Sequence, residues 1–296
     1  MINLVVLRLT MLITLAVGVF YAIRLLRLLN LNKNAIWLFA LNPFVIIELS
    51  NNLHFEGVLV SFLIISIYSI YKNQLFRGSL FWSFAVGVKL TPLLLLPFLY
   101  RYLGFRKSVR FYIITIAFVA ILLGLFIWPS NAQNFIKSIS LYFSNFEFNA
   151  SIFSLVKSIF YSEFGWETVK IIGPWLSKIS LVFILLYALL YKLKTKEHLI
   201  TAMLFGFSIY ILFSATVHPW YIAIPLALSI FTPYRSFVVW SFTVMLSYTF
   251  YNPESVELTL FLTILEYVTF GVCFALEIIK NTRKQEQVLS NLEVER

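Results

Sequence analysis

Apolar runs long enough to cross a lipid bilayer follow one another from end to end of the chain, with only short polar breaks between them. Charged residues make up 12% of the 296 residues, whereas about 25% is usual in a soluble domain. Within a bilayer, a continuous apolar run pairs its backbone groups by forming a helix. The pattern predicts an all-α polytopic membrane protein with about nine transmembrane helices, one re-entrant hairpin and amphipathic interfacial helices.

Basic residues concentrate in the polar breaks between apolar runs. The net charge of +10 is therefore explained by membrane topology, and nucleic acid is not expected as a partner. By the positive-inside rule, these breaks are expected to be cytoplasmic. We therefore expect a single transmembrane domain over 1–279 and a cytoplasmic polar tail over 280–296. The breaks hold 17 of the 23 Lys and Arg residues: Arg24, Arg27, Lys33, Lys72, Arg77, Arg101, Arg106, Lys107, Arg110, Lys192, Lys194, Lys196, Arg235, Lys280, Arg283, Lys284 and Arg296.

The order of runs and breaks sets the expected topology, which begins with the N-terminus on the outer face. The segment 78–100 begins and ends at basic breaks and carries Lys89-Leu90-Thr91-Pro92 in its middle, so it predicts a re-entrant hairpin. Residues 129–171 carry apolar side chains at helical spacing and predict an outer amphipathic segment on the membrane surface. Spans are expected at 4–26, 35–50, 55–71, 111–128, 174–191, 199–217, 220–232, 236–250 and 257–279.

Two polar clusters, Asn51–Glu56 and His218–Tyr221, fall on the same outer face in this topology. Polar groups that converge at one membrane face often mark a functional site. A carboxylate of Glu48 or Glu56 would serve there as a general base toward a sugar hydroxyl. The alternative is a solvated helix turn that is capped by asparagines.

Lys89 is expected at the tip of the broken hairpin, where an ammonium group would pair with a lipid-linked phosphate. The alternative is a lysine that snorkels toward the headgroups. Aromatic rings such as Trp220 and Tyr221 stack on sugars, but they are also common in the interfacial belt. Two distant histidines and a glutamate indicate a metal only weakly, so no metal and no cofactor is predicted, although a divalent ion is compatible with this set.

Three motifs resemble those of the GT-C class of polyprenol-phosphate-sugar-dependent glycosyltransferases, with bacterial mannosyltransferases the nearest. Asn42-Pro43 through Glu48, followed by Asn52-Leu53-His54-Phe55-Glu56, resembles the family's NP…E…GHFD hairpin. Gly87-Val88-Lys89-Leu90-Thr91-Pro92, with the later Pro97, is similar to its K-x-x-P…P hairpin. His218-Pro219-Trp220-Tyr221 is similar to its HPWY turn.

The resemblance implies an inverting transfer of a hexose, with mannose expected, from a polyprenyl-phosphate donor to a lipid or glycan acceptor. The reaction would take place at the outer face of a bacterial inner (plasma) membrane, with the C-terminus cytoplasmic. The implied partners are the donor, the acceptor and membrane lipids. The implied roles are catalytic for Glu48 and Glu56, donor-phosphate binding for Lys89, His218 and Arg8, and sugar or acceptor binding for Asn52, His54, Trp220 and Tyr221.

The chain departs from the family pattern at the key carboxylate. That residue is usually an aspartate in the first outer loop, whereas this chain contains no aspartate, and Glu56 stands where Asp is common. We therefore expect that the N-terminal helix and first outer loop of the family are missing from this chain. Two other hypotheses stay open: a transporter or flippase of lipid-linked sugars, and an inactive partner subunit.

Overall fold

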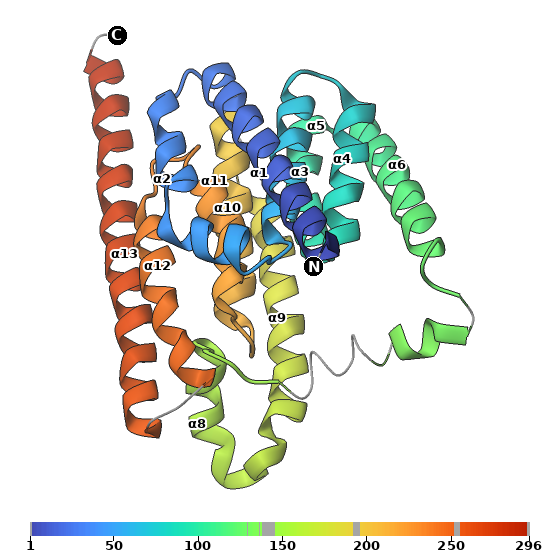
Figure 1. The fold of residues 1–296 in the computed structure, drawn as a ribbon. Coiled ribbons are helices and arrows are strands. Elements are labelled where there is room, and N and C mark those ends of the chain that lie inside the picture. The colour runs from blue at the N-terminus through green and yellow to red at the C-terminus, as the bar shows by residue number, and fades with distance from the viewer. Residues whose placement is uncertain are drawn as a thin grey trace.

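The computed structural model describes residues 2–128, 130–135, 137, 146–191, 196–251 and 255–294. These parts of the chain are helical almost throughout, with one isolated β-bridge between Phe148 and Thr216 and no longer strand among them. The all-α class is therefore confirmed. Figure 1 shows the helices as a bundle, with the basic breaks and the C-terminus at its upper end.

The first half of the bundle is built from helices that neighbour one another in sequence. Its long helices are α1 (Ile2–Leu28), α3 (Glu56–Tyr71), α4 (Leu75–Val88) and α6 (Phe105–Gly124). α1 packs along α3, and α4 packs against both α3 and α6. The contact between α1 and α3 is close because Gly18 presents only hydrogen to Ser61.

The segment expected as one span over 35–50 is a series of short helices rather than one continuous helix. A 3-10 turn (Lys33–Ile36) leads into α2 (Trp37–Ala40), and a π-helix (Val45–Asn51) follows the break at Asn42 and Pro43. Asn42 stabilises the break, because its Oδ1 accepts from the Phe44 N–H at 2.9 Å and its Nδ2 donates to the Ser241 hydroxyl at 2.8 Å. The π-helix then meets α3 at an angle of 101°.

The hairpin expected over 78–100 is confirmed. α4 ends at Val88, Lys89 is extended, and the chain returns through a 3-10 turn (Thr91–Leu95) and α5 (Leu96–Leu103). Leu75 at the start of α4 and Leu103 at the end of α5 line one cavity of about 320 Å³, together with Arg106, Lys107 and Arg110. Both ends of the hairpin therefore lie on the basic side of the molecule, and Lys89 lies at its tip.

The second half begins with α8 (Ile152–Phe164), a 3-10 turn (Gly165–Glu167), α9 (Thr168–Leu190) and α10 (Lys196–Phe213). A 3-10 turn (Pro219–Ile222) and α11 (Ala223–Ser229) follow, then α12 (Ser236–Thr243) with a 3-10 extension (Val244–Tyr251). α13 (Val256–Val294) continues unbroken through the start of the expected tail at 280. Of the expected outer segment 129–171, positions 129, 136 and 138–145 lie outside the described residues.

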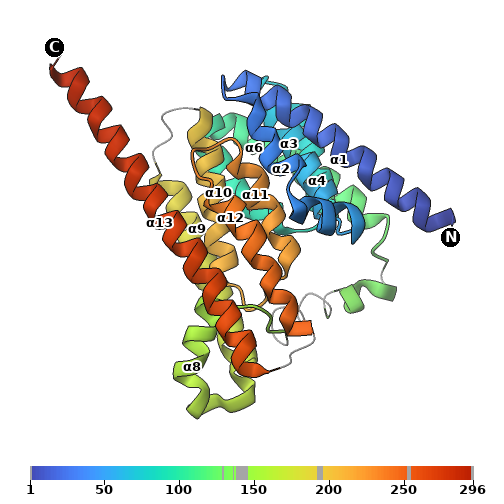
Figure 2. The ribbon, with the colours of Figure 1, turned by 60° about the vertical axis from the view of Figure 1, so that its left-hand side comes forward.

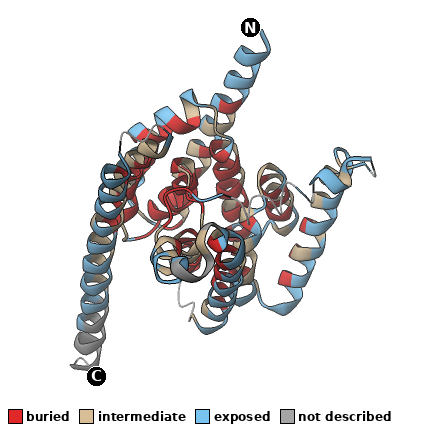
Figure 3. Ribbon diagram, turned by 90° about the horizontal axis from the view of Figure 1, so that it is seen from below, coloured by how far each residue is buried: buried red, intermediate tan, exposed pale blue. Residues whose placement is uncertain are grey.

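In the part of the chain that the structure describes, four helices are long and apolar enough to cross a membrane: Ile2–Leu28, Phe105–Gly124, Thr168–Leu190 and Val256–Lys284. The bent pair Val45–Asn51 and Glu56–Tyr71 makes a fifth if it counts as one span. Five shorter apolar helices lie among the described residues, so the number nine stays a prediction. In Figure 2, α10 and α11 lie between α13 and the α1–α3 pair, and Figure 3 shows buried residues concentrated in the interior of the bundle.

Replacing Gly18 by Ala tests the α1–α3 contact. The new Cβ would lie 2.9 Å from the Ser61 Cα, so backbone must move, and we expect a loss of about 1–3 kcal/mol in the free energy of unfolding. Gly271→Ala in α13 is the matched control: apart from its own helix turn, no atom of the described residues lies within 4 Å of the added Cβ, so the change should stabilise the helix by about 0.5–1 kcal/mol. Denaturant unfolding in micelles measures both, and equal effects of the two variants would contradict the packing described.

Candidate functional site

The two polar turns expected on one face meet through their rings. The His54 imidazole stacks on the Trp220 indole, with centroids 3.7 Å apart and planes 17° apart. The His218 imidazole also stacks on Trp220, at 4.6 Å and 11°. The turn between the π-helix and α3 is thereby joined to the turn before α11, at the end of the bundle away from the basic breaks.

Lys89 at the hairpin tip lies against both turns. Its Nζ donates to Glu56 Oε1 at 2.8 Å and lies 3.8 Å from the centroid of the Tyr221 ring. The Lys89 side chain keeps 31% of its surface exposed, whereas that of Glu56 keeps 9%. The ammonium group is thus held by a carboxylate and an aromatic face and still reaches solvent.

Glu48 is fully buried at the base of the same cluster. Its Oε1 accepts hydrogen bonds from the Tyr248 hydroxyl at 2.6 Å and from Asn52 Nδ2 at 3.3 Å. Its Oε2 lies 3.3 Å from His54 Nε2, but the two groups are not aligned as a hydrogen bond, so this oxygen has no hydrogen-bond donor among the described residues. The carboxylate therefore lies behind the more exposed His54 ring.

The local backbone explains why Glu48 faces inward. π-helical turns are rare and often occur at functional sites. Here the π-helix ends in a tight turn, in which Leu53 has a positive φ of 60° and the His54 N–H donates to the Glu48 carbonyl. This turn directs Glu48 toward Tyr248 and His54 toward Trp220.

Arg8 lies at the edge of this assembly. Its Nη2 donates to the Asn51 carbonyl at 3.4 Å, a long hydrogen bond between exposed groups. The structure therefore brings together Glu48, Asn52, His54, Glu56, Lys89, His218, Trp220 and Tyr221, with Arg8 beside them. Among the residues described, no three His, Cys, Asp or Glu side chains gather in a way that could hold a metal ion.

His218 is uncharged at neutral pH. Burial, with smaller effects of Lys89 and His54, lowers the pKa of its imidazole from 6.5 to about 4. Its Nδ1 lies 3.1 Å from the Tyr251 hydroxyl. His218 can therefore exchange hydrogen bonds with a ligand, but it does not contribute positive charge.

Sequence reasoning missed a second set of polar groups behind His218. Glu266 of α13 is fully buried and accepts from Asn149 Nδ2 at 3.0 Å and from Trp240 Nε1 at 2.8 Å. The Tyr267 hydroxyl donates to the Asn149 carbonyl at 2.7 Å. These bonds fix the chain beside Phe148, whose ring lies 4.6 Å from that of His218.

Asn149 also begins the triplet Asn149-Ala150-Ser151, which matches a glycosylation acceptor. Its side chain is fully buried and its amide is used by Glu266, so the folded chain does not present it for modification. The one signal in the sequence for Glu266 is a charge within an apolar run, which is costly in a membrane and calls for a partner.

The stability of the protein should depend on pH through His218. The folded state holds the neutral imidazole while the unfolded chain binds a proton below about pH 6.5, so stability should fall as the pH drops from 6.5 toward 4. Thermal unfolding of the wild type and of His218→Gln across this range measures the effect. The pH dependence should be weaker in the variant, and identical slopes would contradict the low pKa.

Replacing Glu266 by Leu should lower the free energy of unfolding by about 3 kcal/mol, since the Asn149 and Trp240 donors lose their acceptor in a buried place. Glu266→Gln retains one acceptor oxygen and should cost clearly less. Denaturant unfolding in micelles gives both values. A Leu variant as stable as the wild type would show that these bonds do not hold the Phe148 segment.

Residues 1–104 match the family model described as alpha-(1->6)-mannopyranosyltransferase, N-terminal domain. No curated protein and no solved structure matches the chain. The matched region includes Arg8, Glu48, His54, Glu56 and Lys89, but it ends before the turn at His218. The match confirms the resemblance to GT-C type mannosyltransferases and supports glycosyltransferase activity.

Proposed function

We propose that this chain transfers a mannosyl group from a polyprenyl-phosphate donor to a hydroxyl of a lipid or glycan acceptor, with inversion at the anomeric carbon. The observation that carries the proposal is the assembly of Lys89, Glu56, His54 and Trp220 from three separate segments at one end of the bundle. A cation, carboxylates and aromatic faces in one place are the groups that transfer from a sugar phosphate requires.

Lys89 stabilises the phosphate that leaves. As the bond between the anomeric carbon and the phosphate oxygen breaks, negative charge grows on the phosphate, and a nearby ammonium lowers the energy of that state. The Lys89 ammonium has three N–H donors, and Glu56 occupies one of them. Its partly exposed position leaves room for a phosphate oxygen. Arg8 at the edge of the site is placed to add a second positive charge.

His54, supported by Glu48, accepts the proton of the acceptor hydroxyl. The hydroxyl oxygen attacks the anomeric carbon from the side opposite the phosphate, and its proton passes to the protein. Because Glu48 is fully buried, we assign the direct contact to His54, whose Nε2 faces the carboxylate at 3.3 Å. A carboxylate behind an imidazole orients the ring and stabilises its protonated form. Glu56 is engaged by Lys89 and serves to position that ammonium.

The sugar would contact the aromatic and amide groups of the site. The Trp220 faces are stacked on by His54 and His218 and the Tyr221 ring lies against Lys89, so these two rings offer their edges to the sugar. Asn52 offers an amide beside Glu48. His218 would bind the donor phosphate by a hydrogen bond from its imidazole rather than by charge, because burial lowers its pKa. No cofactor is part of the proposal, since Lys89 supplies the positive charge at the phosphate, and a chelator should leave the rate unchanged.

The proposed setting is the outer face of a bacterial inner membrane, with the C-terminus cytoplasmic. The support comes from charge: the basic breaks at Lys72, Arg106 and Arg110 lie at the end of the bundle opposite the site, and basic loops are typical of the cytoplasmic side.

Lys89→Met should lower the transfer rate by about 10²–10³-fold, because it removes the charge that stabilises the leaving phosphate. Glu48→Gln should lower kcat by at least about 10²-fold, since the base loses its carboxylate. The matched control is Lys178→Met on α9, an exposed lysine that lies over Trp175 and is remote from the site.

The assay follows mannosyl transfer from a radiolabelled polyprenyl-phosphate donor by the purified full chain in lipid nanodiscs. Full activity of Lys89→Met would remove Lys89 from the site. Movement of the intact donor across the bilayer without transfer would favour the transporter hypothesis, for which a broken helix is also typical. Absence of both activities in the wild type would favour the partner-subunit hypothesis.

A further inference from the structure

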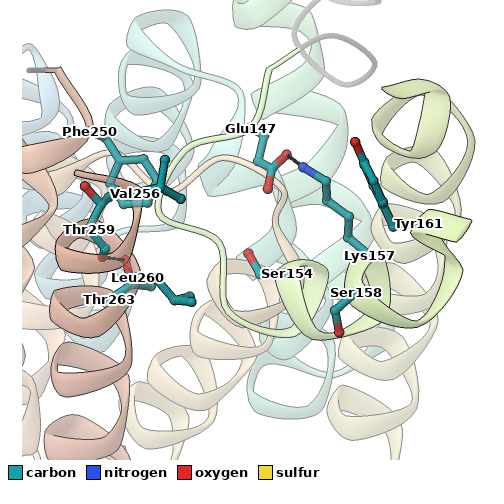
Figure 4. A pocket seen from close by; sticks show the side chains of 10 residues that line it. All are labelled: Glu147, Ser154, Lys157, Ser158, Tyr161, Phe250, Val256, Thr259, Leu260 and Thr263. Carbon is teal, nitrogen blue, oxygen red and sulfur yellow. Dashed lines mark hydrogen bonds and ion pairs between the residues drawn. The ribbon is translucent and has the colours of Figure 1, made fainter. Parts of the chain in front are cut away.

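A groove of about 460 Å³ lies between α8 and the start of α13, at the same end of the bundle as the candidate site. This volume falls within the range usual for small-molecule sites. Figure 4 shows the Glu147–Lys157 pair and Ser154 on one wall, with Val256, Leu260 and the two threonines of α13 on the other. None of these residues takes part in the reaction proposed above.

The groove adjoins the candidate site through a shared aromatic wall. Phe250 lines the groove, and its ring lies 5.1 Å from that of Phe148. Phe148 in turn lies 4.6 Å from the ring of His218, and Glu147 directly precedes Phe148 in the chain. Two aromatic rings, those of Phe250 and Phe148, therefore lie between a ligand in the groove and His218.

The charge of the groove favours a neutral ligand. Lys157 Nζ donates to Glu147 Oε2, and both side chains remain partly exposed, at 24% and 28%. The pair carries no net charge, so a phosphate that approached Lys157 would also meet the Glu147 carboxylate. A hydrocarbon chain in the groove would desolvate both charges and would offer no hydrogen bonds in place of those to water, which is costly.

The hydroxyl groups of the groove are arranged to accept hydrogen bonds. Ser154, Thr259 and Thr263 donate their protons to backbone carbonyls of their own helices, at 2.8, 3.0 and 2.9 Å. Their oxygens keep lone pairs for a donor from outside the protein. Sugar hydroxyls are such donors, and the C–H faces of a pyranose ring match apolar side chains such as Leu260.

We propose that this groove binds the saccharide part of the acceptor, a neutral mannoside, and presents its terminal hydroxyl to the candidate site. The inference rests on the proposed function, since it names the acceptor class of that reaction. Glu147 accepts from sugar hydroxyls, Lys157 donates to them, and Phe250 and Leu260 contact the apolar face of the ring.

The test combines direct binding with steady-state kinetics on the full chain in nanodiscs. Ser158 lines the groove, so Ser158→Trp should fill it. The matched control is Ile159→Trp, because Ile159 is the next residue of α8, is 70% exposed and lies outside the groove. Binding of methyl α-mannoside and α-1,6-mannobiose is followed by saturation-transfer NMR, which needs no catalysis.

We expect mannobiose binding to wild type and to Ile159→Trp, and loss of binding in Ser158→Trp. In the transfer assay, Ser158→Trp should raise the acceptor KM by about tenfold or more, as expected for the loss of about one good contact, with the donor KM unchanged. Glu147→Gln and Lys157→Met should raise the same KM.

Transfer with a normal acceptor KM in Ser158→Trp would overturn the groove assignment and leave the proposed function intact. A rise in the donor KM alone, or binding of octyl α-mannoside without binding of mannobiose, would overturn it in favour of a lipid chain. Mannobiose binding that Ser158→Trp abolishes in a chain without transfer activity would support the groove and contradict the proposed function.

Discussion

The stacking of His54 and His218 on the Trp220 indole joins the two halves of the chain at the candidate site. The first half contributes the turn before α3, and the second contributes the turn before α11. The neighbouring Tyr221 lies under the Lys89 ammonium, so the same turn places the hairpin tip. Each aromatic contact is worth about 0.5–1.5 kcal/mol beyond the area it buries. The positions of the two imidazoles and of the Lys89 ammonium depend on these contacts.

Three buried glutamates have different roles because their hydrogen-bond partners differ. Glu266 is surrounded by donors, Asn149 and Trp240, and ties a loop to α13. Glu56 is paired with the ammonium of the hairpin tip. Glu48 has one oxygen bound by donors and the other facing an imidazole without a hydrogen bond. A buried carboxylate in a membrane protein needs a partner or a function. The unsatisfied oxygen of Glu48 is what distinguishes a candidate base from a structural anchor.

The sequence allowed the class, the hairpin and the convergence of the polar turns to be predicted, because apolar length, basic breaks and proline act locally. Lys89 at a hairpin tip is the clearest example. The break after Asn42 has a local signal in Pro43 that the expectation of one span over 35–50 did not use. Its partner Ser241, almost 200 residues later, has no such signal. Tyr248 lay in an expected span and gave no sign that it would meet Glu48. Partners that lie far apart in sequence leave no local pattern, and these were the residues that reasoning missed.

Histidine NMR tests the central contact most directly, because the chain contains only three histidines. In protein labelled at histidine, the ring protons of His54 and His218 should both shift upfield in the field of the Trp220 ring, whereas His198, beside Tyr191 at 6.2 Å, lies apart from it. Trp220→Leu should move the first two signals together and leave the third in place. A Trp220→Leu spectrum in which His54 and His218 keep their wild-type shifts would show that the two turns do not meet.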